Sequence, residues 1–122
     1  MMKYNIQHRQ EVNLLIYDIL VEKDLFMKKV FSEKNMYNLI NENPHQRFGQ
    51  LLCNYVFPNN KLNIIGYTLF GKYDPFNVES IDTYLKVCKI YNQKPLFEKD
   101  DSTFMKTVVE NLKNDINDLI LQ

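Results

Sequence analysis

Arg47, Gln50 and Asn54 are the side chains whose types and spacing best fit a recognition site. They follow one another at intervals of three and four residues. On a helix that turns by about 100° per residue, they fall within about 60° of one another. A guanidinium beside two side-chain amides makes a strip of hydrogen-bonding groups, and lysine would not reproduce the planar fork of Arg47. The pattern predicts a binding site for a partner on one face of this helix.

A structural role for the same strip is the alternative that the residues leave open. Arg47 would then tie its helix to an acidic loop such as the one that holds Asp74, with Gln50 and Asn54 solvated beside it. Gly49 lies inside the same segment, where glycine costs about 1 kcal/mol relative to alanine in a helix. Such a glycine usually allows another backbone to come close.

Catalytic and metal-binding patterns do not stand out in the chain. His8 and His45 are its two histidines, and no phosphate loop with the required Ser or Thr and no His-Glu-x-x-His motif is present. Cys53 and Cys88 each lie in an apolar periodic segment, and we expect both to be buried, reduced thiols. We therefore expect a protein that is not an enzyme and that uses no cofactor and no metal.

The elements that must position the strip are predicted to be helices. Asp24 and Ser32 are expected to cap the second and third helices. Asn43 followed by Pro44 is a strong start signal for the helix that carries the strip. Asn77 or Ser80 is expected to cap the next one. Apolar residues recur at helical spacing over residues 7–21, 25–31, 36–40, 44–57, 81–91 and 105–120. The apolar face expected for the helix over residues 44–57 consists of Phe48, Leu51, Leu52, Tyr55 and Val56.

These helices predict an all-α fold, a compact bundle of four to six helices in a single domain over residues 1–122. Residues 61–73 are ambiguous, because both a short hairpin and a helical turn with loops fit Gly66 and Gly71. We expect the final stripe, which includes Leu112, to pack against the helix that starts at Pro44.

Composition and charge narrow the function classes. The 122 residues carry 15 basic and 15 acidic side chains, which disfavours both a strongly basic nucleic-acid binder and an acidic DNA mimic. The chain lacks an apolar run long enough to span a membrane and an N-terminal signal peptide, so we expect a cytoplasmic protein without a membrane partner. Lysines in the N-terminal half could form a weak basic patch, although acidic neighbours interleave with them: Lys23, Lys28, Lys29 and Lys34.

Two short motifs resemble a group of small uncharacterised helical proteins of bacteria, phages and mobile elements. The motifs are Arg-x-Gly-Gln-x-x-x-Asn, at residues 47–54, and a downstream Asp-x-Phe with an acidic segment, at residues 74–80. The resemblance covers residues 43–80 and brings no established activity with it. It implies a phage or mobile-element accessory role.

Small size and the lack of a catalytic pattern favour a non-enzymatic module that binds another protein. A concrete form is an inhibitor of a host defence nuclease, similar to an anti-CRISPR protein. The alternative is a nucleic-acid-associated regulator that uses the Lys-rich N-terminal face. The partner's identity and the oligomeric state are not specified by the sequence.

Overall fold

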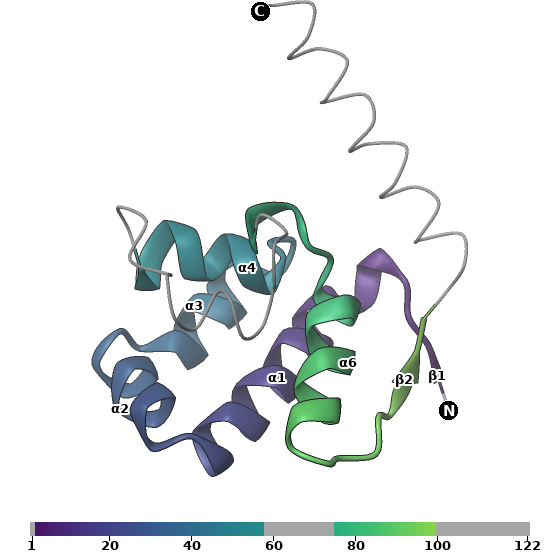
Figure 1. The fold of residues 1–122 in the computed structure, drawn as a ribbon. Coiled ribbons are helices and arrows are strands. Elements are labelled where there is room, and N and C mark those ends of the chain that lie inside the picture. Colours follow the sequence, from purple (N-terminus) through teal and green to yellow (C-terminus); the bar gives the residue numbers. More distant parts are fainter. Residues whose placement is uncertain (1, 58–74, 100–122) are drawn as a thin grey trace, which may run out of the picture.

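The computed structural model of this chain describes residues 2–57 and 75–99. The expectations for residues 61–73 and for the final stripe with Leu112 lie outside the described residues. The described part is mainly helical, which confirms the predicted fold class (Figure 1). Its elements in chain order are β1 (Met2–Lys3), the 3-10 turn η1 (Ile6–His8), α1 (Arg9–Lys23), α2 (Leu25–Glu33), α3 (Met36–Glu42), α4 (Phe48–Leu51), the π-helical η2 (Leu52–Val56), the 3-10 turn η3 (Pro75–Asn77), α6 (Ser80–Ile90) and β2 (Phe97–Glu98).

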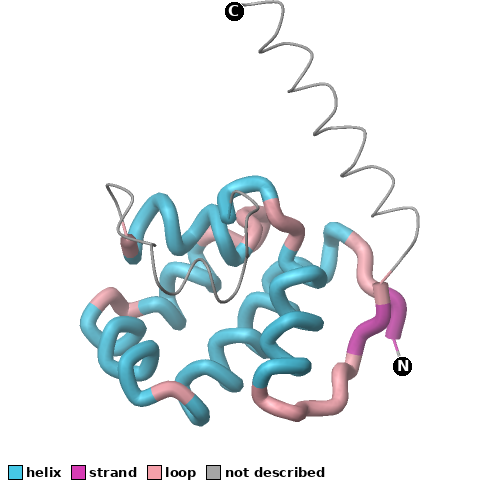
Figure 2. The backbone as a smooth tube through the Cα atoms, viewed as in Figure 1, coloured by secondary structure: helices cyan, strands magenta, loops and turns pink. Residues whose placement is uncertain are grey.

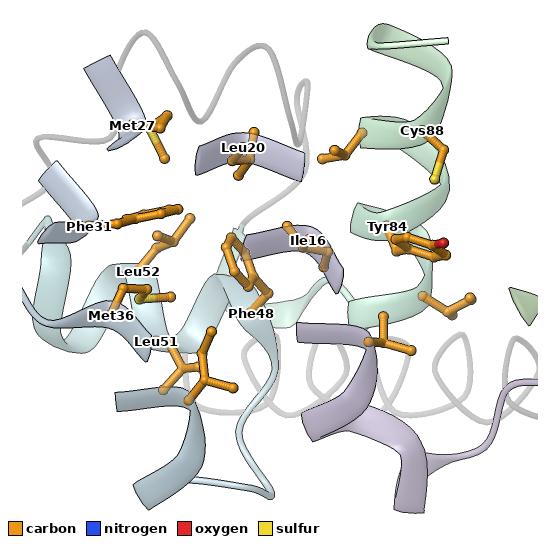
Figure 3. Close-up of a cluster of buried hydrophobic side chains, with 14 of the residues drawn as sticks. Ile16, Leu20, Met27, Phe31, Met36, Phe48, Leu51, Leu52, Tyr84 and Cys88 are labelled. Atoms are coloured by element: carbon orange, nitrogen blue, oxygen red, sulfur yellow. The ribbon is translucent and has the colours of Figure 1, made fainter. Parts of the chain in front are cut away.

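Helix α1 is the centre of the fold. It packs against α6 on one side and against α2 and α3 on the other (Figure 1). The apolar positions predicted from helical spacing supply the core, where Phe48 and Ile16 lie between a group on α2 and α3 and a group on α6 (Figure 3). Side chains that are almost completely buried include Val12, Ile16, Leu20, Met27, Phe31, Met36, Ile40, Phe48, Leu51, Leu52, Ile81 and Val87.

A row of aromatic rings leads from the surface into this core. The exposed Tyr37 lies 6.0 Å from Tyr17, and Tyr17 lies 5.8 Å from the buried Phe31, measured between ring centroids. Phe31 then meets Phe48 edge to face at 6.2 Å. Aromatic pairs at such distances stabilise a fold beyond the area that they bury. The row joins α1, α2, α3 and α4, since each ring comes from a different one of these helices.

Asp24 separates α1 from α2, as its capping role predicts. Its backbone is extended, and its Oδ1 accepts a hydrogen bond from the Met27 amide at 3.1 Å. The Asp24 amide still closes the last turn of α1 through the Leu20 oxygen. One residue therefore ends one helix and caps the next.

Three other expected helix starts are wrong. Helix α6 begins at Ser80 with Glu79 as its N-cap, so neither Asn77 nor Ser80 caps it. Ser32 lies inside α2, and α3 begins at Met36 after Asn35, which adopts a left-handed conformation with φ 55°. Asn43 does not cap α4, whose N-cap is Arg47; the Asn43 Nδ2 donates back to the Leu39 oxygen at 2.8 Å, at the end of α3. Helix α4 begins four residues later than Pro44, at Phe48. The Asn43 Oδ1, the atom that would cap α4, instead accepts from the Gln46 Nε2 at 3.2 Å.

The helix from Phe48 onward changes its winding after one turn. The Phe57 amide donates to the Leu52 oxygen at 2.7 Å, which is the five-residue spacing of a π-helix. Of the predicted apolar face, Phe48, Leu51 and Val56 are buried, whereas Tyr55 keeps 40% of its surface exposed. The wider turn thus places Tyr55 on the surface, where regular helical spacing had predicted a core position.

A small parallel sheet joins the two ends of the described chain and was not predicted from the sequence. Met2 pairs with Phe97 and Lys3 with Glu98 (Figure 2). Strands of two residues carry no periodic pattern that a sequence could reveal. Their pairing holds the N-terminal segment beside the chain that follows α6.

Candidate functional site

Arg47 and Phe76 form a close pair on the surface between α4 and η3. Arg47 precedes α4 in an extended conformation, with φ −70° and ψ 155°. Its Nε donates to the Phe76 carbonyl oxygen at 3.1 Å, and its guanidinium carbon lies 6.0 Å from the centroid of the Phe76 ring. This is a cation–π geometry that also fixes the backbone of Phe76. The ring keeps 39% of its surface exposed.

Gln50 and Asn54, the other members of the predicted strip, hold nearby chain segments. The Gln50 Oε1 accepts from the Arg47 amide at 2.7 Å, which satisfies a backbone donor at the start of α4. The Asn54 Nδ2 donates to the Gln46 Oε1 at 3.2 Å. Arg47 and Gln50 thus contact each other, and Asn54 bonds the residue before Arg47, but Arg47 precedes the helix rather than lying on its face. Whether they bind a partner stays a prediction.

An amide surface continues from this strip, and we define it as Asn43, Gln46, Asn54 and Tyr55. The Gln46 Nε2 donates to the Asn43 Oδ1 at 3.2 Å, and the Tyr55 hydroxyl lies 3.5 Å from both side chains. The segment from residue 35 to residue 60 contains two charged residues, Glu42 and Arg47. The site is therefore a neutral surface of amides and tyrosine with one arginine at its edge.

Sequence reasoning missed four members of this site, of which Asn43 had been given only a capping role. Gln46 and Tyr55 gave no sequence signal, because one follows an expected cap and the other had been predicted to face the core. Phe76 belongs to the Asp-x-Phe motif at residues 74–76, which was the available hint that it lies near Arg47. Asp74, the suggested structural partner of Arg47, lies outside the described residues.

A buried ionic cluster lies below this surface. Glu79 keeps 3% of its surface exposed and binds the guanidinium of Arg9 through both carboxylate oxygens, each at 2.7 Å. The hydroxyl of the fully buried Tyr4 donates to the same carboxylate. Arg9 also donates through Nη1 to the His45 carbonyl oxygen at 2.9 Å. The cluster therefore links three parts of the sequence: the N-terminal segment with Tyr4 and Arg9, the loop at His45, and Glu79.

The cluster sets the ionisation of its members. Burial raises the pKa of Glu79, but the hydrogen bonds from Arg9 and Tyr4 outweigh burial and leave the pKa below its ordinary value. The hydrogen bond to Glu79 raises the pKa of Arg9, and burial together with the Glu79 charge raises that of Tyr4. At neutral pH the cluster is thus a carboxylate, a guanidinium and a neutral phenol. A carboxylate held this way is a poor general acid or base.

The histidines and cysteines occupy separate places in the described part. The His8 ring lies 5.4 Å from the Phe97 ring between centroids, in a tilted arrangement, whereas His45 is exposed. Cys88 is buried, and burial raises the pKa of its thiol. Cys53 is half-buried, so the expectation of two fully buried thiols is wrong for this residue. Within residues 2–57 and 75–99, no three metal-ligating side chains come together.

Comparison with known proteins adds no assignment. No protein-family model matches this chain, and no curated protein or solved structure is significantly similar to it. In the described part, no helix has the length and apolar character needed to cross a membrane.

Proposed function

We propose that this protein is a non-enzymatic module that binds another protein through Arg47, Gln50 and Asn54 together with Phe76 and Tyr55. The observation that carries the proposal is the Arg47–Phe76 pair, which holds an arginine and an aromatic ring together at the surface. Arginine and tyrosine are enriched at the energetic centres of protein interfaces. Side chains that are already held in place lose less conformational freedom when a partner binds.

The amide surface supports a protein partner more than a nucleic acid. Amides and tyrosines supply adaptable hydrogen bonds and rigid contact area in the binding loops of antibodies. Phosphate binding instead requires several cations, and the segment from residue 35 to residue 60 offers one arginine. A π-helical turn such as Leu52–Val56 also recurs at functional sites in other proteins.

The alternative is a nucleic-acid-associated regulator, and it would use a different face. Lys28 and Lys29 are exposed on α2, and Lys34 follows that helix. The Glu22 Oε1 lies 3.6 Å from the Lys23 Nζ, and Glu33 is the last residue of α2, so the net positive charge of this face is small. If phosphate contacts dominated, affinity would fall steeply with salt, whereas binding through the amide surface would change little.

The biological setting proposed here is a phage or mobile-element accessory protein in the bacterial cytoplasm. Its support is the resemblance of residues 43–80 to proteins of such elements. An inhibitor of a host defence nuclease is the concrete form of this idea. Adding the purified protein to a reconstituted defence nuclease and measuring cleavage would test that form, and unchanged cleavage at excess protein would contradict it for that nuclease.

The binding proposal itself is tested by capture from a host lysate at several salt concentrations. Wild-type protein, Arg47→Ala and Lys29→Ala would serve as baits, because Lys29 is an exposed residue on another face. We expect a protein that is retained by wild type and by Lys29→Ala but lost with Arg47→Ala. Loss with Lys29→Ala and retention with Arg47→Ala would favour the α2 face instead.

A further inference from the structure

The first turn of α6 holds both halves of the Arg47–Phe76 pair. Phe76 lies three residues before Glu79, which is the N-cap of α6, so the chain itself links the ring to this helix. The loop that carries Arg47 has no such link, because it belongs to a distant part of the sequence. Side chains must therefore fix the loop relative to α6.

Two hydrogen-bonded paths fix the Arg47 loop relative to α6. Glu79 binds Arg9, and Arg9 donates to the His45 oxygen at 2.9 Å. In the second path the hydroxyl of Ser80 donates to the Asn13 Oδ1 at 2.7 Å and accepts from the Phe48 amide at 3.2 Å.

Asn13 completes the second path. Its Nδ2 donates to the Gln46 oxygen at 2.9 Å. The backbone is thus held on both sides of Arg47, at the carbonyl groups of His45 and Gln46 and at the amide of Phe48. Asn13 and Ser80 are completely buried, so water does not compete for the bond between them or for the bond from the Phe48 amide to Ser80.

The chemistry of the Glu79–Arg9 pair indicates that the pair fixes the position of the Arg47 loop and does more than add stability. A buried ion pair gains little net stability over an apolar pair of the same volume, because both charges lose their hydration. A bidentate Arg–carboxylate pair does fix geometry, since the two planar groups meet in one orientation. Here the guanidinium of Arg9 uses its third nitrogen to hold the loop.

We propose that Glu79 and Ser80 are positioning residues that act through Arg9 and Asn13 to set the orientation in which Arg47 is presented beside Phe76. The functional meaning of this role rests on the proposed function, but the positioning itself does not need the partner to be known. Removing either path should loosen the Arg47 loop while the rest of the helical fold remains intact.

Amide hydrogen exchange in the full chain, followed by NMR, tests the positioning. The variants are Ser80→Ala, which removes the bridge to Phe48, and Arg9→Lys, which keeps a cation for Glu79 but lacks the fork that also reaches His45. Thr83→Val is the matched control, because Thr83 is a buried polar residue one turn further along α6. The reference amide is that of Tyr91, which bonds the Val87 oxygen at the other end of α6.

We expect Ser80→Ala to raise the exchange rate of the Phe48 amide by about tenfold relative to that of Tyr91, as the loss of one buried hydrogen bond predicts. Arg9→Lys should weaken the protection of the Arg47 Nε–H, which bonds the Phe76 oxygen. Thr83→Val should change neither the exchange rate of the Phe48 amide relative to that of Tyr91 nor the protection of the Arg47 Nε–H. If Ser80→Ala does not fold, the Arg9→Lys measurement decides alone.

Unchanged protection of the Phe48 amide in Ser80→Ala and of the Arg47 Nε–H in Arg9→Lys would overturn the positioning proposal. That result would leave the proposed function standing, because Arg47→Ala tests binding separately. Loosened protection together with full partner binding by Arg47→Ala would have the opposite meaning: the positioning would stand and the proposed binding site would fail.

Discussion

Arg47 places its guanidinium carbon 6.0 Å from the centroid of the Phe76 ring, while its Nε donates to the carbonyl oxygen of the same residue at 3.1 Å. One side chain therefore contacts both the ring and the backbone of a residue 29 positions away. This relationship joins the recognition and structural interpretations of Arg47, because an arginine that anchors a neighbouring segment is also held in a fixed orientation for a partner.

Arg47→Ala should lower the free energy of unfolding by about 1–2 kcal/mol, the combined value of a hydrogen bond and a half-exposed cation–π contact. Thermal unfolding followed by circular dichroism would measure the loss as a fall of a few degrees in Tm. In a double-mutant cycle with Phe76→Leu, the two losses should be less than additive. Full additivity would show that the ring and the guanidinium do not interact. Coupling to Asp74, which lies outside the described residues, stays a separate prediction.

The acid sensitivity of the fold should depend on Glu79. Its pKa in the folded protein lies below the ordinary value, so its ionised form contributes stability above the pKa of the unfolded chain, near pH 4.5. This contribution is lost as the pH falls from that value through the lower, folded pKa. Urea unfolding of wild type and Glu79→Gln at a series of pH values would measure it. We expect the variant to be less stable at neutral pH and the difference to shrink in acid; a difference that grows in acid would contradict the direction of the pKa shift.

Thr83→Val should raise stability. The Thr83 hydroxyl is buried and has no hydrogen-bond partner among the described residues. Valine has nearly the same shape, and replacing an unsatisfied buried hydroxyl by a methyl group should gain about 1 kcal/mol. Urea unfolding would show a higher midpoint at an unchanged slope. A clear loss of stability would show that the hydroxyl does bond a partner.

The two cysteines should react at different rates. Cys53 is half-buried and Cys88 is buried, with a raised pKa that keeps it a thiol. Because the thiolate is the reactive form, a maleimide should modify Cys53 first in the native protein and Cys88 only on unfolding. Mass spectrometry of Cys53→Ser and Cys88→Ser, each with one remaining thiol, would separate the two rates. Equal native rates would contradict the burial of Cys88.

The helical fold class could be predicted from the sequence because apolar periodicity survives in a single chain. The residues that α1 buries, including Ile16 and Leu20, follow helical spacing. Helix starts were less predictable, because the sequence around Asn43 is compatible both with a cap of the next helix and with the last turn of α3. The local residues favour both, and tertiary contacts of the following loop decide between them.

The candidate site was predictable only in part, for a similar reason. Arg47, Gln50 and Asn54 could be grouped by their spacing, but Phe76 comes from a distant segment and Tyr55 is displaced by the π-helical turn. The Glu79–Arg9–Tyr4 cluster joins residues up to 75 positions apart. No local pattern in the sequence marks such a contact.

Binding of the captured partner by purified variants tests the central claim most directly. Isothermal titration calorimetry would compare the Kd of wild type with those of Arg47→Ala and Lys29→Ala, with each variant first shown to be folded at the temperature used. An arginine at the centre of an interface is worth about 2 kcal/mol or more, so Arg47→Ala should weaken binding by about 30-fold or more. Lys29→Ala, on the α2 face, should stay within about twofold of wild type. A partner that binds Arg47→Ala as tightly as wild type would contradict the assignment of the binding site.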